Sequence, residues 1–231
     1  MFRRTAFAAA VALALVAPAV VAAQTCVGYS SFANGPVQAG ASASFADDVS
    51  VYGVGIGVGA VKGGFVAGQI GMVDVDVEGV DASGTAFGVT GGWQIPVGVQ
   101  TAARAMQVCP IASYDYTTGE AEEGGISADV NQSDIALGLA LGAAFTSSPA
   151  LSIVPFGSVS WVNSSVELDS DFGDFDGDED FGLVDLGVGF VANQWITIRP
   201  SVAIPFALPD DAEGDEVFSI NFAFNFGRSA R

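Results

Sequence analysis

The chain has 231 residues, half of them hydrophobic, with 30 glycines and a formal net charge of −19. So acidic a chain has no basic surface to neutralise phosphates, which excludes a nucleic-acid partner and disfavours docking on anionic lipid head groups. The glycines interrupt the apolar residues, so that only one stretch near the start is long enough for a membrane helix.

The start of the chain has the pattern of an export signal. Two arginines precede a long apolar run, which ends in small residues of the kind a signal peptidase reads. This arrangement predicts a cleavable signal peptide over 1–23, with an uncleaved membrane anchor as the alternative. Residues 24–34 are then expected to form an N-terminal periplasmic segment, and 35–231 the folded domain.

From residue 35 onward the hydrophobic period is two, the spacing of a β-strand with one apolar face. Each alternating run is about ten residues long, the length with which a tilted strand crosses a bilayer. If the alanine-rich first run and the proline-containing fifth run are not strands, eight strands remain. The predicted strands are 35–46, 49–60, 65–75, 84–95, 106–117, 132–145, 151–163, 181–192, 196–208 and 216–226.

The predicted connections alternate in kind. Some are short and carry no acid, while the longer ones are acidic and rich in glycine, serine and aspartate. After signal removal, four of the five basic residues fall on the side of the short connections or in the C-terminal tail. Sorting of this kind predicts a barrel with short periplasmic turns and acidic outer loops. The long connections are 76–83, 118–131, 164–180 and 209–215.

Aromatic residues on the apolar face gather at both ends of the predicted strands, as in the two interfacial girdles of outer-membrane barrels. The alternative, a secreted soluble β-sandwich with aromatic residues in its core, predicts neither the girdles nor the sorted charges. The outer group is Tyr52, Phe87, Tyr114, Tyr116, Trp161, Phe206 and Phe218, and the periplasmic group is Trp93, Phe145, Phe190 and Phe226.

The last predicted strand carries a more specific pattern. Ser219, Asn221, Phe224 and Phe226 fit a polar–x–Gly–x–x–aromatic–x–aromatic frame, with Asn221 where glycine is usual. With this strand, the mature chain resembles the small bacterial outer-membrane β-barrel families, including the group named for its outer-membrane protein β-barrel domain. The resemblance implies an all-β, antiparallel up-and-down transmembrane barrel in the bacterial outer membrane. It also implies contact with the barrel-assembly machinery, membrane lipid and lipopolysaccharide.

The chain contains no histidine. A serine or aspartate alone cannot form a Ser-His-Asp relay, because no group takes the hydroxyl proton near neutral pH. We therefore expect a non-enzymatic barrel with acidic surface loops, acting in the envelope or in surface interactions, and we expect no cofactor. The alternative is a narrow porin-like channel for ions or small solutes.

One basic residue interrupts a predicted strand. Arg199 alternates with lipid-facing residues and should point into the lumen, as should Asp185 of the adjoining strand. A buried cation needs a partner, which predicts a lumen charge pair, with Asp134 and Asp115 as other candidate partners. Such a pair either fills a small barrel or sets the ion selectivity of a narrow channel.

The only two cysteines, Cys26 and Cys109, belong to an oxidising compartment. Because Cys109 lies near the periplasmic start of its strand and faces inward, a disulfide to Cys26 would pin the N-terminal segment into the periplasmic mouth of the barrel. Closure of so long a loop would also stabilise the fold.

The densest acidic stretch contains Asp174, Asp176, Asp178 and Asp180 around a glycine. Alternating carboxylates can surround Ca²⁺, which takes six to eight oxygen ligands. The stretch does not meet the EF-hand frame, and the alternative is a solvated loop. If the stretch is functional, we expect it to bind divalent cations loosely, and these cations would join the loop to lipopolysaccharide phosphates.

Overall fold

The computed structural model describes most of the chain from Thr25 onward, and the predicted signal peptide lies outside the described residues. Within the described part, no helix is long and apolar enough to cross a membrane. One helical turn, η1 (Thr25–Val27), precedes the strands. The described ranges are 25–29, 37–59, 63–77, 80–99, 104–123, 126–148, 150–170, 175–208 and 214–226.

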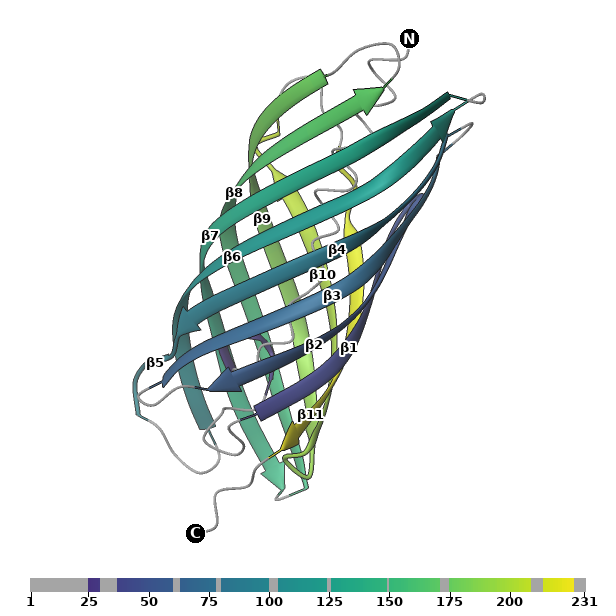
Figure 1. The fold of residues 1–231 in the computed structure, drawn as a ribbon. Helices are drawn as coiled ribbons and strands as arrows, with labels where there is room; N and C mark the ends of the chain where they lie inside the picture. Colours follow the sequence, from purple (N-terminus) through teal and green to yellow (C-terminus); the bar gives the residue numbers. More distant parts are fainter. Residues whose placement is uncertain are drawn as a thin grey trace.

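Ten long strands form a closed barrel in which every strand pairs antiparallel with its neighbours along the chain (Figure 1). The first strand pairs with the last, which closes the barrel. The two-residue β5 (Ile95–Pro96) pairs with β6 beyond the end of β4. The long strands are β1 (Val37–Ala46), β2 (Val49–Gly59), β3 (Gly64–Val77), β4 (Val80–Trp93), β6 (Arg104–Glu123), β7 (Ile126–Ser148), β8 (Leu151–Ser170), β9 (Phe175–Ala192), β10 (Ile196–Phe206) and β11 (Val217–Phe226).

This architecture confirms the ten-stranded up-and-down barrel. The eight-stranded alternative is wrong, since both of the weaker runs are strands. The β-sandwich is also wrong, because the sheet closes on itself and leaves no free edge.

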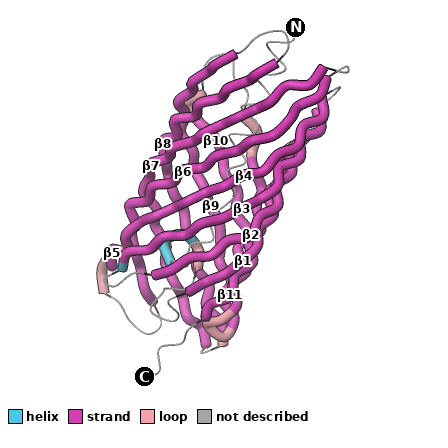
Figure 2. The backbone as a smooth tube through the Cα atoms, viewed as in Figure 1, coloured by secondary structure: helices cyan, strands magenta, loops and turns pink. Residues whose placement is uncertain are grey.

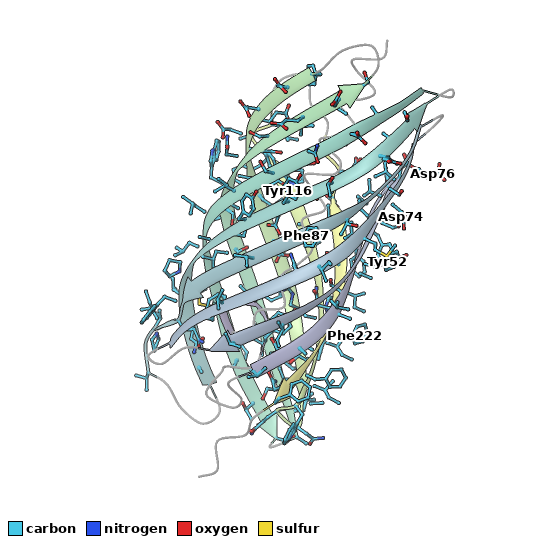
Figure 3. All side chains as sticks on the ribbon, viewed as in Figure 1. Tyr52, Asp74, Asp76, Phe87, Tyr116 and Phe222 are labelled. Carbon is cyan, nitrogen blue, oxygen red and sulfur yellow. A yellow bond between two sulfur atoms is a disulfide. The ribbon has the colours of Figure 1, made fainter. Side chains whose placement is uncertain are left out.

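The alternation of side chains explains why the sheet closes this way. On β11, Phe222, Phe224 and Phe226 are 42–50% exposed on the outer face, whereas Asn221, Ala223 and Asn225, which alternate with them, are buried inside. Exposed aliphatic residues cover the outer face of the other strands in the same manner, as Figure 3 shows for the side chains as a whole. An apolar outer belt around a polar interior is the arrangement of an outer-membrane β-barrel, as the sequence predicts.

The acidic connections differ from the prediction. Most of 76–83, 118–131 and 164–180 is not loop but strand, which extends β3, β4 and β6 to β9 beyond the apolar belt. In Figure 1 these strands rise well past the others. The loop prediction is wrong there because the ladder continues where both faces become polar. Backbone pairing satisfies the amide groups in water as it does in lipid.

The interior changes along the barrel axis. At the end with the strand extensions, two buried apolar clusters line it, one with Val49, Val51, Val73 and Val75 and the other with Val162, Phe181 and Val217. Polar side chains follow below, and η1 occupies the part near the opposite end, where β1 begins and β11 ends (Figure 2). The predicted functional residues of the lumen lie in these two lower layers.

Candidate functional site

The disulfide between Cys26 and Cys109 is present, as the sequence predicts, with the two Cα atoms 6.0 Å apart. Both cysteines are completely buried and pack with Ala140 of β7. The disulfide therefore holds η1 inside the barrel, against β6, β7 and β8 (Figure 2). Residues 25–29, the described part of the predicted periplasmic segment, are within the lumen. We call residues 25–29 the plug.

Two glycines, Gly28 in the plug and Gly189 in the barrel wall, allow the plug to lie close to the wall. Gly28 has a φ of 85°, which favours glycine, and a side chain at this position would also overlap the Phe156 ring. On β9, a Cβ atom added to Gly189 would overlap the carbonyl of Gly28. The plug backbone thus lies directly on the β9 wall. In the sequence, the signal for this contact is a glycine at an inward-facing position of β9, Gly189.

Arg199 of β10 points into the lumen and is 3% exposed. Its Nη2 atom lies 3.4 Å from Asp185 Oδ2, so the structure brings the predicted charge pair together. Its Nη1 atom donates a hydrogen bond of 3.2 Å to the carbonyl oxygen of Val27. Arg199 therefore connects the barrel wall to the plug, a contact that the sequence analysis missed.

Two aromatic rings complete the surroundings of Arg199. Its guanidinium carbon is 5.2 Å from the ring centroid of Tyr29 and 4.7 Å from that of Phe156. Both distances suit cation–π attraction, which is strongest where water is excluded.

Asp115 and Asp134, the other candidate partners of Arg199, form a separate polar layer. They lie opposite each other on β6 and β7, and each is 6% exposed. Gln69 Nε2 donates to Asp115 Oδ1 at 3.2 Å, and Gln132 Nε2 lies 3.0 Å from both carboxylate oxygens of Asp134. Amide groups, rather than Arg199, therefore hold these two carboxylates.

The β2 wall of the lumen carries no side chains over much of its length. The outer residues Tyr52, Val54, Ile56 and Val58 are exposed, so the glycines that alternate with them face the interior. On the neighbouring β1, Gln38 and Ser42 are buried inside the barrel. The lumen is thus bounded by a bare and polar wall on the side of β1 and β2.

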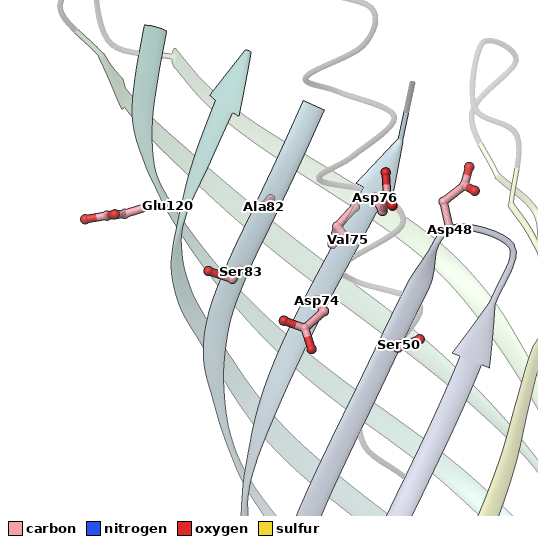
Figure 4. Close-up of a pocket in the computed structure, with 8 residues that line it drawn as sticks. All are labelled: Asp48, Ser50, Asp74, Val75, Asp76, Ala82, Ser83 and Glu120. Carbon is pink, nitrogen blue, oxygen red and sulfur yellow. The ribbon is translucent and has the colours of Figure 1, made fainter. Parts of the chain in front are cut away.

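A second candidate region lies on the outer face, on the strand extensions. A depression of about 460 Å³ is lined there mainly by acidic and hydroxyl side chains (Figure 4). Register places Ser50, Asp74, Ser83 and Glu120 side by side across four strands. Figure 3 shows Asp74 and Asp76 beyond Tyr52 and Phe87 of the aromatic girdle. We call Asp48, Asp74, Asp76 and Glu120 the acidic rim.

The predicted calcium loop is not a loop. Asp174 lies outside the described residues, and the other three aspartates alternate along the outer face of β9. Asn163 Nδ2 donates to Asp180 Oδ1 at 3.1 Å, and the Ser165 hydroxyl donates to Asp178. Within the described ranges, no three acidic, cysteine or histidine side chains are close enough together to hold a metal ion.

Comparison with known proteins finds the barrel fold and nothing narrower. No family model and no curated protein matches the chain. The N-terminal β-barrel domain of OprF from Pseudomonas aeruginosa is 12% identical, with a TM-score of 0.37 over 82% of this chain and 96% of that chain.

Two further barrels have similar scores. LpxR from Salmonella typhimurium is 8% identical, with a TM-score of 0.45 over 82% of this chain and 100% of that chain. The outer membrane protease OmpT from Escherichia coli is 7% identical, with a TM-score of 0.42 over 83% and 94%. Similarity this low carries no argument about activity.

Proposed function

We propose that this protein is a non-enzymatic outer-membrane barrel that is closed on the periplasmic side and acts through its outer surface. The plug carries the proposal, because it is held in the lumen both by a disulfide and by Arg199. A segment anchored at two points leaves little cross-section for solutes. The strand extensions, rather than the lumen, then meet the surroundings of the cell.

The side chains of the lumen support the absence of catalysis. The chain has no histidine, and the most buried carboxylates, Asp115 and Asp134, already accept hydrogen bonds from glutamine amides. A general acid or base needs a free position toward a substrate. These two aspartates are better suited to joining neighbouring strands inside the barrel.

The acidic rim supports a surface role in the lipopolysaccharide layer. Its carboxylates lie on the outer face just beyond the aromatic girdle, the level at which lipid phosphates are found. Direct contact between carboxylate and phosphate is repulsive, so we expect shared divalent cations between them. These cations would be loosely held, in place of a chelated calcium site.

Planar-bilayer recording tests the closed lumen. The oxidised wild-type protein should show no steady single-channel current in KCl, while its folded state is verified by heat-dependent gel mobility. A steady current through the oxidised protein would refute the closed barrel.

Binding to lipopolysaccharide vesicles tests the surface role. Wild-type barrels should associate more strongly with Mg²⁺ than with a chelator, and an Asp74→Asn, Asp76→Asn, Glu120→Gln variant should lose most of that difference. The matched control makes the same change in charge on β9, by replacing the carboxylates of Asp176, Asp178 and Asp180. Equal vesicle binding with and without Mg²⁺ would rule out the shared cations.

The second candidate is a narrow channel. The bare glycine face of β2 and the polar residues of β1 favour it, because this side of the lumen presents backbone and polar groups rather than apolar side chains. Its charge would favour cations, since the described lumen carries Asp115, Asp134 and Asp185 against Arg199. The same bilayer recording separates the two functions.

A further inference from the structure

We infer that the plug is a releasable gate with two latches, in which the Arg199 contact protects the Cys26–Cys109 disulfide from reduction. This inference rests on the proposed closed lumen and adds how the lumen would open. It also names what would pass, which is small cations.

The first latch is ionic. Arg199 reaches the plug through the carbonyl oxygen of Val27 and the ring of Tyr29, and reaches the wall through Asp185. All of these contacts are non-covalent and meet at one guanidinium group. Loss of that one side chain would therefore remove these contacts together, and the packing of Gly28 on Gly189 and of Tyr29 on Ala223 would remain.

The second latch is covalent and lies on the opposite wall. The disulfide ties Cys26 to β6, and neither cysteine has any exposed surface. A thiolate must approach a disulfide sulfur directly before exchange can occur. The plug has to move first, and the Arg199 contact resists that movement.

The order of opening follows from this geometry. Once the ionic latch is released, a dithiol reductant can enter from the periplasmic end and attack the disulfide. The sulfur–sulfur bond breaks, the two cysteines take up two electrons and two protons, and the reductant closes to its own disulfide. After this step the Cys26–Cys109 bond no longer holds the plug to β6.

The residues that would line the lumen without the plug indicate which class of solute could pass. Departure of the plug would open a lumen that holds the Asp185–Arg199 pair and two further carboxylates, Asp115 and Asp134, beside the glycine face of β2. Carboxylates in excess over cations on a narrow wall attract small cations. Anions and bulky solutes would pass poorly.

The test measures the reduction rate and the current on the same preparations. Oxidised barrels in lipid vesicles are treated with dithiothreitol, and free thiols are counted by mass spectrometry after alkylation. We expect Arg199→Gln to be reduced at least several-fold faster than wild type. Arg104→Gln, which removes an equal charge at the exposed periplasmic rim, should match wild type.

Arg199→Lys serves if the glutamine variant fails to fold. An ammonium keeps the charge but cannot bind Asp185 and the Val27 carbonyl together as the guanidinium fork does. Its reduction rate should lie between those of wild type and Arg199→Gln. Equal reduction rates for wild type and the folded Arg199 variants would overturn the protective latch.

Currents complete the test. Reduced Arg199→Gln and a Cys26→Ser, Cys109→Ser, Arg199→Gln variant should both conduct K⁺ in preference to Cl⁻, while oxidised Arg199→Gln stays closed. A closed lumen in both would overturn the gate and leave the proposed function intact. Current through oxidised wild type that does not change on reduction would overturn both.

Discussion

The lumen around Arg199 and the outer rim around Glu120 both carry charged residues on β-strands, but they do so in different surroundings. Arg199 is almost fully buried, and its neighbours are fixed in position around it. The carboxylates of the rim are exposed and line an open depression. The stability of a charged side chain in the lumen therefore depends on particular partners. The effect of the rim depends mainly on how many carboxylates lie close together there.

The same difference distinguishes residues that stabilise the barrel from residues that interact with its surroundings. A buried ion left without its partner is costly, because neither water nor protein compensates it. An exposed carboxylate is solvated with or without its neighbours, so its removal changes stability little. We expect the lumen to determine whether the barrel stays closed and stable, and the rim to determine what the barrel meets outside.

The largest expected effect comes from removing the lumen cation. Arg199→Met should lower the free energy of unfolding by about 3 kcal/mol, because Asp185 is left inside the barrel without its cation. The added change Asp185→Asn should recover part of the loss. Urea titration of the protein in lipid vesicles measures both, and an unchanged single variant would contradict the buried pair.

Loss of the disulfide is expected next. Cys26→Ser with Cys109→Ser should lower the free energy of unfolding by about 2–4 kcal/mol, because the bridge closes a loop of 83 residues in the unfolded chain. The same urea titration applies, with wild type fully reduced under denaturing conditions as the reference. A difference between that reference and the double variant would point to the serines rather than to the lost bridge.

A smaller effect is expected from the wall that contacts the plug. Gly189→Ala should cost about 1–3 kcal/mol, since its new methyl group overlaps the Gly28 carbonyl. In a variant that lacks both the disulfide and Arg199 the plug can move away, so the cost should shrink. The control is Gly68→Ala, whose methyl group meets no atom closer than 3.9 Å. Equal costs at both glycines would contradict the close contact.

The smallest effect is expected on the rim. Neutralising Asp74, Asp76 and Glu120 together should change the free energy of unfolding by less than about 1 kcal/mol. Relief of mutual repulsion favours a slight gain, which added salt should reduce. A loss as large as that of Arg199→Met would show that the rim, like the lumen, depends on specific partners.

The sequence predicted the class of fold because a transmembrane barrel repeats one simple constraint. Each strand must present apolar residues to lipid and polar residues to the lumen, as the alternation over 216–226 does. The same constraint placed Arg199 and Asp185 inside the barrel and Cys109 opposite the lipid-facing residues. All of these predictions concern which face of a strand a residue occupies.

The ends of the strands were less accessible to sequence analysis. In β9, Asp176, Asp178 and Asp180 continue the strand into water, where neither face needs to be apolar. Without the contrast between lipid and lumen, such a stretch has the composition of a loop. The extent of β3, β4 and β6 to β9 was therefore underestimated, and the calcium loop was expected where a sheet is found.

By itself, the sequence determined the barrel and the inward direction of Arg199, since both follow from local periodicity. Only the tertiary structure decided what that cation touches. Arg199 meets the Val27 carbonyl across a separation of 172 residues, and this contact exists because β1 closes on β11 and the disulfide draws residues 25–29 into the lumen. Local sequence patterns do not predict such a contact, because it depends on how the whole chain folds into a closed barrel.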